Sequence, residues 1–136
     1  KQANISKVVI GKNDQWKTEI NLGKKTNQKF VSIPHVKFIE MVMYKLKLVG
    51  IDCVCREESY TSKCSFFDRE EIKKHDVYLG KRIKRGLFRI STGLKVNADV
   101  NGACNILIKE IPDAFADGIE AVVVPPVKMK FYKQVA

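Results

Sequence analysis

The feature that most constrains the fold is a helix-length amphipathic segment between two short apolar runs. The first run, Val8-Val9-Ile10, is followed by a glycine and polar residues that are typical of a turn. The second run, residues 51–55, begins directly after Gly50. Between the runs, apolar residues recur at three- and four-residue steps, namely Ile39, Val42, Leu46 and Val49. Because Pro34 suits the first turn of a helix and Gly50 its end, the pattern predicts a strand, a helix and a second strand.

This β–loop–α–β unit predicts an α/β fold. Short loops at the helix ends suit a parallel or mixed sheet with the helix packed on one face. A second helix is predicted after Asp99, because apolar residues again lie on nearby turns, and Pro112 ends it. We therefore expect a mixed sheet with two packed helices.

The composition indicates a folded domain that binds polyanions. The chain has 136 residues, of which 45% are hydrophobic, so it can form a core. Lysine and arginine number 25 against 15 aspartates and glutamates, which gives a formal net charge of +10. A domain this basic suits nucleic acid first and an acidic membrane surface second. No apolar run approaches the ~18 residues that span a bilayer and no signal peptide follows Lys1, so we expect a cytoplasmic protein.

Basic residues are densest between positions 81 and 95, where no acidic residue occurs and where we expect part of a β-hairpin. They are Lys81, Arg82, Lys84, Arg85, Arg89 and Lys95. Ile83, Leu87 and Phe88 are interleaved with them, so such a ribbon can pack one side and bind phosphates with the other. Lys24 and Lys25 also suit nucleic acid, although a solvated charged surface explains them equally. Lys63 suits either a phosphate contact or a turn.

The chain has four cysteines, which are Cys53, Cys55, Cys64 and Cys104. No pair has the C-x2-C spacing of a zinc ribbon. Cys53 and Cys55 alternate in the second apolar run, so in a strand their side chains point the same way. Reduced thiols that pack as small apolar side chains explain all four. The alternative is a mixed metal site with His35 or His75.

Three carboxylates stand where α/β sheets gather functional groups, at strand ends and helix starts. Glu57 and Glu58 follow the second predicted strand, and Asp99 precedes the second predicted helix. Carboxylates that converge there can hold Mg²⁺, which prefers oxygen ligands and supports phosphodiester cleavage. The alternative is that Asp99 is the N-cap of its helix and that both glutamates are solvated.

Three segments of the chain carry a recognisable pattern. They are EESYTSK at residues 57–63, GKRIKRGLFR at residues 80–89 and NADVNGACNIL at residues 97–107. In this order and spacing they resemble the TnpB (OrfB) family, whose members accompany insertion sequences and are relatives of the type V CRISPR effectors. The resemblance covers about residues 5 to 110.

The resemblance implies the C-terminal part of a RuvC-like nuclease domain with the RNase H fold. In that family three acidic residues bind Mg²⁺ and cut DNA, and a guide RNA selects the target. The motif of the last acidic residue contains Asp99. The first acidic residue lies upstream of this sequence, so the expected partners are DNA, guide RNA and the missing N-terminal region. Residues 1–112 would form the nuclease part, with a basic hairpin inserted at about 60–96, and residues 113–136 an extended tail.

The chain departs from the family at the middle glutamate. Most members carry it at the end of the strand that corresponds to Val8-Val9-Ile10, where this chain has Gly11. Either the site is inactive, or Glu57 or Glu58 supplies the carboxylate from the adjacent strand. We favour Glu58, and we expect it to bind Mg²⁺ together with Asp99.

A second departure concerns the zinc ribbon that many family members carry. Members often have two cysteine pairs between the TSK motif and the last aspartate, but here only Cys64 remains. We expect Phe66-Phe67 and Leu87-Phe88 to close a small apolar hairpin instead, and we predict no structural zinc.

The leading functional hypothesis is a nucleic-acid-binding part of a transposon-encoded, RNA-guided DNA endonuclease that cleaves by metal-activated water. Because the chain lacks one carboxylate, we expect it to be inactive alone. The alternative is a nuclease-dead DNA- or RNA-binding protein, such as a repressor, on the same scaffold. A third hypothesis is an insertion-sequence remnant without a role. None of them involves a membrane.

Overall fold

The computed structural model describes residues 5–13 and 35–118. In chain order the elements are β1 (Lys7–Lys12), α2 (His35–Leu48), β2 (Asp52–Glu57), β3 (Lys81–Lys84), β4 (Leu87–Arg89), β5 (Lys95–Asn97) and α3 (Ala98–Glu110). This mixture of helices with parallel and antiparallel strands confirms the α/β class. Within these ranges, no helix is long and apolar enough to cross a membrane.

The two apolar runs form a parallel pair, as their spacing predicts. β1 and β2 pair in register from Lys7 opposite Asp52 to Lys12 opposite Glu57. The predicted turn at Gly11 is wrong, because β1 continues through Gly11, which lies opposite Arg56. The physical reason is that β2 also continues past its apolar run, so the backbone pairing extends two residues beyond the apolar side chains.

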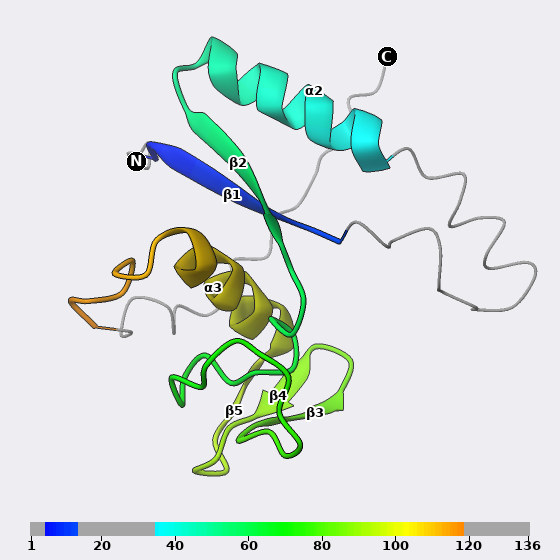
Figure 1. Ribbon diagram of the computed structural model, residues 1–136, viewed down its shortest axis with the longest axis vertical. Coiled ribbons are helices and arrows are strands. Elements are labelled where there is room, and N and C mark those ends of the chain that lie inside the picture. Colours follow the sequence, from blue (N-terminus) through cyan, green and yellow to red (C-terminus); the bar gives the residue numbers. More distant parts are fainter. Residues whose placement is uncertain (1–4, 14–34, 119–136) are drawn as a thin grey trace, which may run out of the picture.

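The strand pair lies between the two helices (Figure 1), with α2 above it and α3 below in that view. The predicted helix is confirmed as α2, which packs against β2. α3 contacts both strands, and Glu110 at its C-terminal end fixes it there. The Glu110 carboxylate pairs with Lys7 Nζ at 3.2 Å and also with Arg56 Nε.

The basic segment forms a three-stranded antiparallel sheet in the order β3-β4-β5. The predicted hairpin is confirmed as β3 and β4, whose turn contains Gly86 at a φ of 73°, a conformation that favours glycine. β5 adds a third strand and leads directly into α3. The sheet therefore places the basic segment at the N-terminal end of α3.

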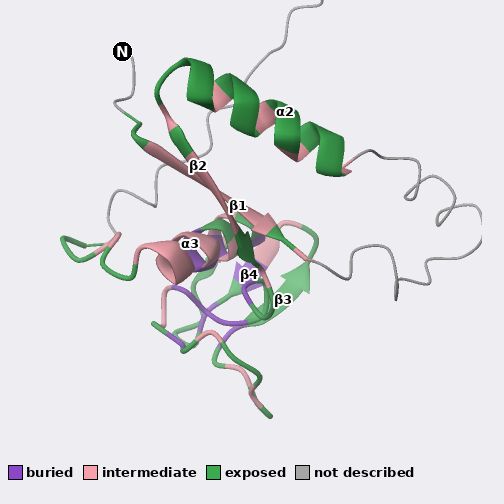
Figure 2. Ribbon diagram, turned by 45° about the horizontal axis from the view of Figure 1, so that its top comes forward, coloured by how far each residue is buried: buried purple, intermediate pink, exposed green. Residues whose placement is uncertain are grey.

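The core lies between this small sheet and α3. Phe88, Ile90 and Ala98 are buried, and Phe67 and Val96 pack against them. Phe67 thus packs against the cluster that contains Phe88, but the predicted hairpin between the two Phe-containing segments is wrong, because residues 66–67 lie in a turn and β4 pairs with β3 and β5. Figure 2 shows that the buried residues gather around α3 and the loops beside it, whereas α2 is mostly exposed.

Buried hydrogen bonds organise the long loop between β2 and β3. Asn101 and Asn105 of α3 have no exposed surface. Asn101 accepts from Phe66 N at 2.9 Å, and both asparagines donate to Cys64 O, at 2.9 and 2.8 Å. Glu70 accepts from two other backbone N–H groups of the loop. Polar contacts to α3 and within the loop therefore hold the segment between β2 and β3.

Some sequence predictions fall outside the described residues. Lys24 and Lys25 lie there, and so do residues 119–136 of the predicted tail at 113–136. The part of that tail that is described, residues 113–118, forms successive turns and not the extended segment that we expected.

Candidate functional site

Two of the three predicted carboxylates line one cavity. Glu58, directly after β2, and Asp99, in the first turn of α3, both face a space of about 550 Å³, which we call the carboxylate cavity. Lys63 and Arg82 line it as well. Glu58 and Asp99 are 41 residues apart in the sequence, and the packing of α3 against β1 and β2 brings them to the same cavity.

Asp99 is not the N-cap of its helix, so that alternative from the sequence is wrong. The cap is Asn97, whose side-chain oxygen accepts from Asp99 N at 2.8 Å and from Val100 N at 3.1 Å. The Asp99 side chain is 83% exposed, and its Oδ1 lies 3.9 Å from Arg82 Nη2. Because an exposed ion pair at this distance contributes little stability, the Asp99 carboxylate can exchange Arg82 for another cation.

Glu58 occupies the space beside Gly11. A Cβ atom at Gly11 would lie 2.8 Å from Glu58 Oε2 and 2.6 Å from Ile106 Cδ1. The backbone fixes this approach, since Glu58 N donates to Lys12 O at 3.2 Å and so continues the β1–β2 pairing. The carboxylate of Glu58 therefore lies where a side chain at position 11 would begin.

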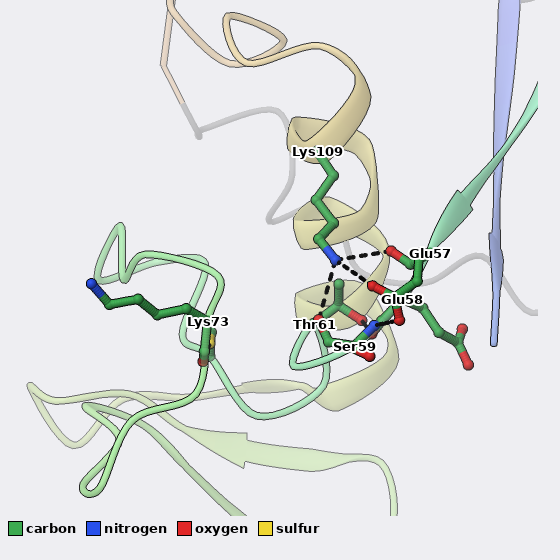
Figure 3. A network of polar contacts seen from close by, with 7 residues as sticks. Glu57, Glu58, Ser59, Thr61, Lys73 and Lys109 are labelled. Atoms are coloured by element: carbon green, nitrogen blue, oxygen red, sulfur yellow. Dashed lines mark hydrogen bonds and ion pairs between the residues drawn. The ribbon is translucent and has the colours of Figure 1, made fainter. Parts of the chain in front are cut away.

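Glu57 has a different environment. Its carboxylate accepts from Ser59 N at 2.6 Å and from Lys109 Nζ at 3.1 Å. The hydrogen bond from Ser59 lowers the pKa of Glu57, and Lys109 adds to this effect against the opposing effect of burial. Figure 3 shows Glu57 joined to Lys109 on α3, with the Glu58 side chain pointing away from this network. Glu57 is not among the residues that line the carboxylate cavity.

The predicted basic residues form a surface with one ordered row. Lys81 lies opposite Arg89 on β4, and Arg89 lies opposite Lys95 on β5. All three residues are exposed, as are Lys84 and Arg85 beside the β3–β4 turn. Like charges directly opposite each other are unfavourable in a sheet. An anion such as a phosphate backbone would relieve this repulsion.

The cysteines are placed as small buried or half-buried side chains. Cys64 and Cys104 are buried, and burial raises the pKa of Cys104 to about 11. The Cys64 thiol lies 3.5 Å from Lys73 O. The alternative from the sequence was a metal site that combines cysteines with His35 or His75. His75 Nε2 lies 2.7 Å from the backbone oxygen of Glu71. In the part of the chain that the structure describes, no three His, Cys, Asp or Glu residues are grouped to hold a metal ion.

Sequence reasoning missed two features of the cavity. Tyr60 lines it with a positive φ of 66°, which a non-glycine residue rarely adopts. We expected Arg82 to bind nucleic acid, but the sequence did not predict that it lies close to Asp99. No local signal in the sequence predicts either feature, because both depend on contacts between distant segments.

Comparison with protein families identifies the segment that contains this site. The family described as Cas12f1-like, TNB domain matches residues 35–106, which is more than half of the chain. The match extends from α2 into α3 and includes Glu58 and Asp99. No curated protein and no solved structure gives a significant match. The chain belongs to the Cas12f1-like TNB domain family, within the TnpB/Cas12 proteins that its three motifs resemble.

Proposed function

We propose that the chain is part of an RNA-guided DNA endonuclease and that Glu58 and Asp99 are two of its metal ligands. The observation that carries this proposal is the shared cavity, in which both carboxylates lie beside Lys63 and Arg82. Membership of the TnpB/Cas12 group of nucleases supports it independently. Glu57, which is tied to Lys109, is a structural residue in this proposal.

The residues of the cavity suit Mg²⁺. This ion is commonly bound by one or two carboxylates, with water and substrate phosphate as the other ligands. Glu58 and Asp99 supply two carboxylates, and Asn13 adds an amide to the lining. When bound, Mg²⁺ would activate water and stabilise the leaving oxygen of a phosphodiester. A third carboxylate would come from the upstream region of the protein.

The basic side chains would hold and orient the nucleic acid. Arg82 can bind a phosphate through two parallel N–H groups, and it already lies beside Asp99. The exposed row of Lys81, Arg89 and Lys95 would bind backbone phosphates farther from the cavity. We therefore expect binding of DNA or RNA to weaken steeply as salt concentration rises.

The position of Glu58 also supports a RuvC-like, RNase H fold with a displaced middle carboxylate. Gly11 leaves space beside β1, and the Glu58 carboxylate fills it.

The test uses the full-length protein with its guide RNA and target DNA. Asp99→Ala and Glu58→Gln should each abolish Mg²⁺-dependent cleavage, whereas Glu57→Gln should retain it. The Glu57 variant is the matched control, because it neutralises the adjacent carboxylate without changing the cavity. Cleavage by Glu58→Gln at the wild-type rate would refute the assignment of Glu58.

A nuclease-dead DNA- or RNA-binding protein is the second candidate. Gly11 favours it, as does the fact that only two carboxylates line the cavity among the described residues. In this case the full-length wild-type protein would bind target DNA in a salt-dependent manner and leave it intact in Mg²⁺. Cleavage that requires both Asp99 and Glu58 would exclude this candidate.

A further inference from the structure

Tyr60 is an aromatic residue in the lining of the carboxylate cavity. It lines the cavity together with Asp99, Lys63 and Arg82, and it is 37% exposed. The cavity therefore combines two carboxylates, two cations and one accessible aromatic side chain. Neither metal binding nor phosphate binding uses this ring.

The backbone holds Tyr60 in this place in an unfavourable conformation. Its φ of 66° is in the left-handed region, which favours glycine and asparagine. The Tyr60 carbonyl accepts from Lys63 N and Cys64 N, both at 3.0 Å. On the other side, the buried Thr61 donates to Glu58 O through its N–H at 3.2 Å and through its hydroxyl at 2.7 Å. These bonds keep a strained residue at the edge of the site, where strain is often functional.

An aromatic ring beside cations has a defined partner in nucleic acids. Lys63 and Arg82 attract phosphates, and the face of a nucleobase can stack on an aromatic side chain without regard to sequence. Stacking of this kind needs an unpaired base, because the bases of a duplex already stack on their neighbours.

We propose that Tyr60 is a stacking platform for a base of single-stranded nucleic acid whose phosphates contact Lys63 and Arg82. The proposal rests on the proposed nucleic-acid function and adds a positioning residue to it. By holding the base next to the phosphate, the ring would fix the strand relative to Glu58 and Asp99. It predicts that the chain binds single strands better than duplexes of the same length.

The experiment is a fluorescence anisotropy titration of the 136-residue chain with a labelled oligodeoxynucleotide of about ten nucleotides. EDTA is present, so that the result does not depend on metal binding. Tyr60→Asn removes the ring but tolerates a positive φ, and it should weaken binding on the order of 10-fold. Tyr60→Phe keeps the ring and should bind as the wild type does.

Two further measurements separate stacking from a structural role. An oligomer without bases should bind the wild type and Tyr60→Asn equally, because only the base contacts the ring. Urea unfolding should show Tyr60→Asn to be at least as stable as the wild type, since asparagine relieves the strain.

The outcomes are distinguishable. Equal binding of the base-containing oligomer by the wild type and Tyr60→Asn would overturn the stacking role alone. A wild-type chain that binds neither oligomer would overturn the nucleic-acid function as well. Loss of binding to the oligomer without bases in Tyr60→Asn would show that the ring is only structural and would also refute the proposal.

Discussion

Glu70 is the residue whose substitution tests the organisation of the long loop most sharply. It is 7% exposed, and its Oε2 and Oε1 accept from Ser65 N at 2.7 Å and Leu79 N at 2.9 Å. One carboxylate thus joins the start and the end of the segment between them. Glu70→Gln keeps the size of the side chain but has one acceptor oxygen instead of two.

The magnitude follows from these two hydrogen bonds. A hydrogen bond to a charged group contributes about 1.5–3 kcal/mol, and an unsatisfied buried donor costs about 1–3 kcal/mol. Glu70→Gln removes one such bond and places an NH₂ group against a backbone N–H. We therefore expect the free energy of unfolding to fall by about 2–3 kcal/mol.

The assay is urea unfolding followed by circular dichroism, with Glu71→Gln as the control. Glu71 is the adjacent residue, but its side chain is 71% exposed and pairs with Lys73 at the surface. Its substitution should change the unfolding free energy far less than Glu70→Gln does, because an exposed ion pair contributes little stability. Equal effects of the two variants would refute the claim that the Glu70 carboxylate holds the loop.

Two other predictions concern residues of the same long loop between β2 and β3. Gly80→Ala should destabilise the fold by about 1–3 kcal/mol in urea unfolding, because its Cβ would lie 2.2 Å from a ring carbon of the buried Phe88. Gly102→Ala is the control and should not destabilise the fold in this way, because a Cβ there would meet open space. Burial raises the pKa of Asp68, but hydrogen bonds from Ser65 and Ser91 outweigh it and lower the pKa. Since the folded pKa lies below the unfolded value, this stabilisation exists above about pH 4 and is lost as the pH falls through the folded pKa. The melting temperature of Asp68→Asn should therefore fall less on acidification than that of the wild type.

The elements with a clear period were predictable from the sequence. The apolar spacing along α2 and Gly50 after it predicted the helix, and the apolar run that follows predicted β2. The end of β1 was not predictable, because Gly11 is typical of a turn while its pairing with Arg56 is a long-range effect. The loop after β2 depends on contacts such as that of Asn101 with Cys64, which are 37 residues apart.

The candidate site shows the same limit. The motifs identified Asp99 and two glutamates, but not which glutamate faces the cavity. The structure distinguishes them because successive side chains at a strand end point to opposite sides, so Glu57 faces Lys109 and Glu58 faces Gly11. The capping role of Asn97 was missed because both Asn97 and Asp99 are good N-cap residues, and only the extended backbone of Asn97 decides between them.

The most direct test of the central claim is the binding of Mn²⁺, as a paramagnetic substitute for Mg²⁺, to the 136-residue chain. The measurement is the broadening of backbone amide signals in NMR spectra during a Mn²⁺ titration. We predict that broadening is centred on Glu58 and Asp99, that Glu58→Gln and Asp99→Asn each abolish it there, and that Glu57→Gln does not. Broadening centred elsewhere, or broadening at the cavity that survives both substitutions, would contradict the proposal that these two carboxylates share a metal ion.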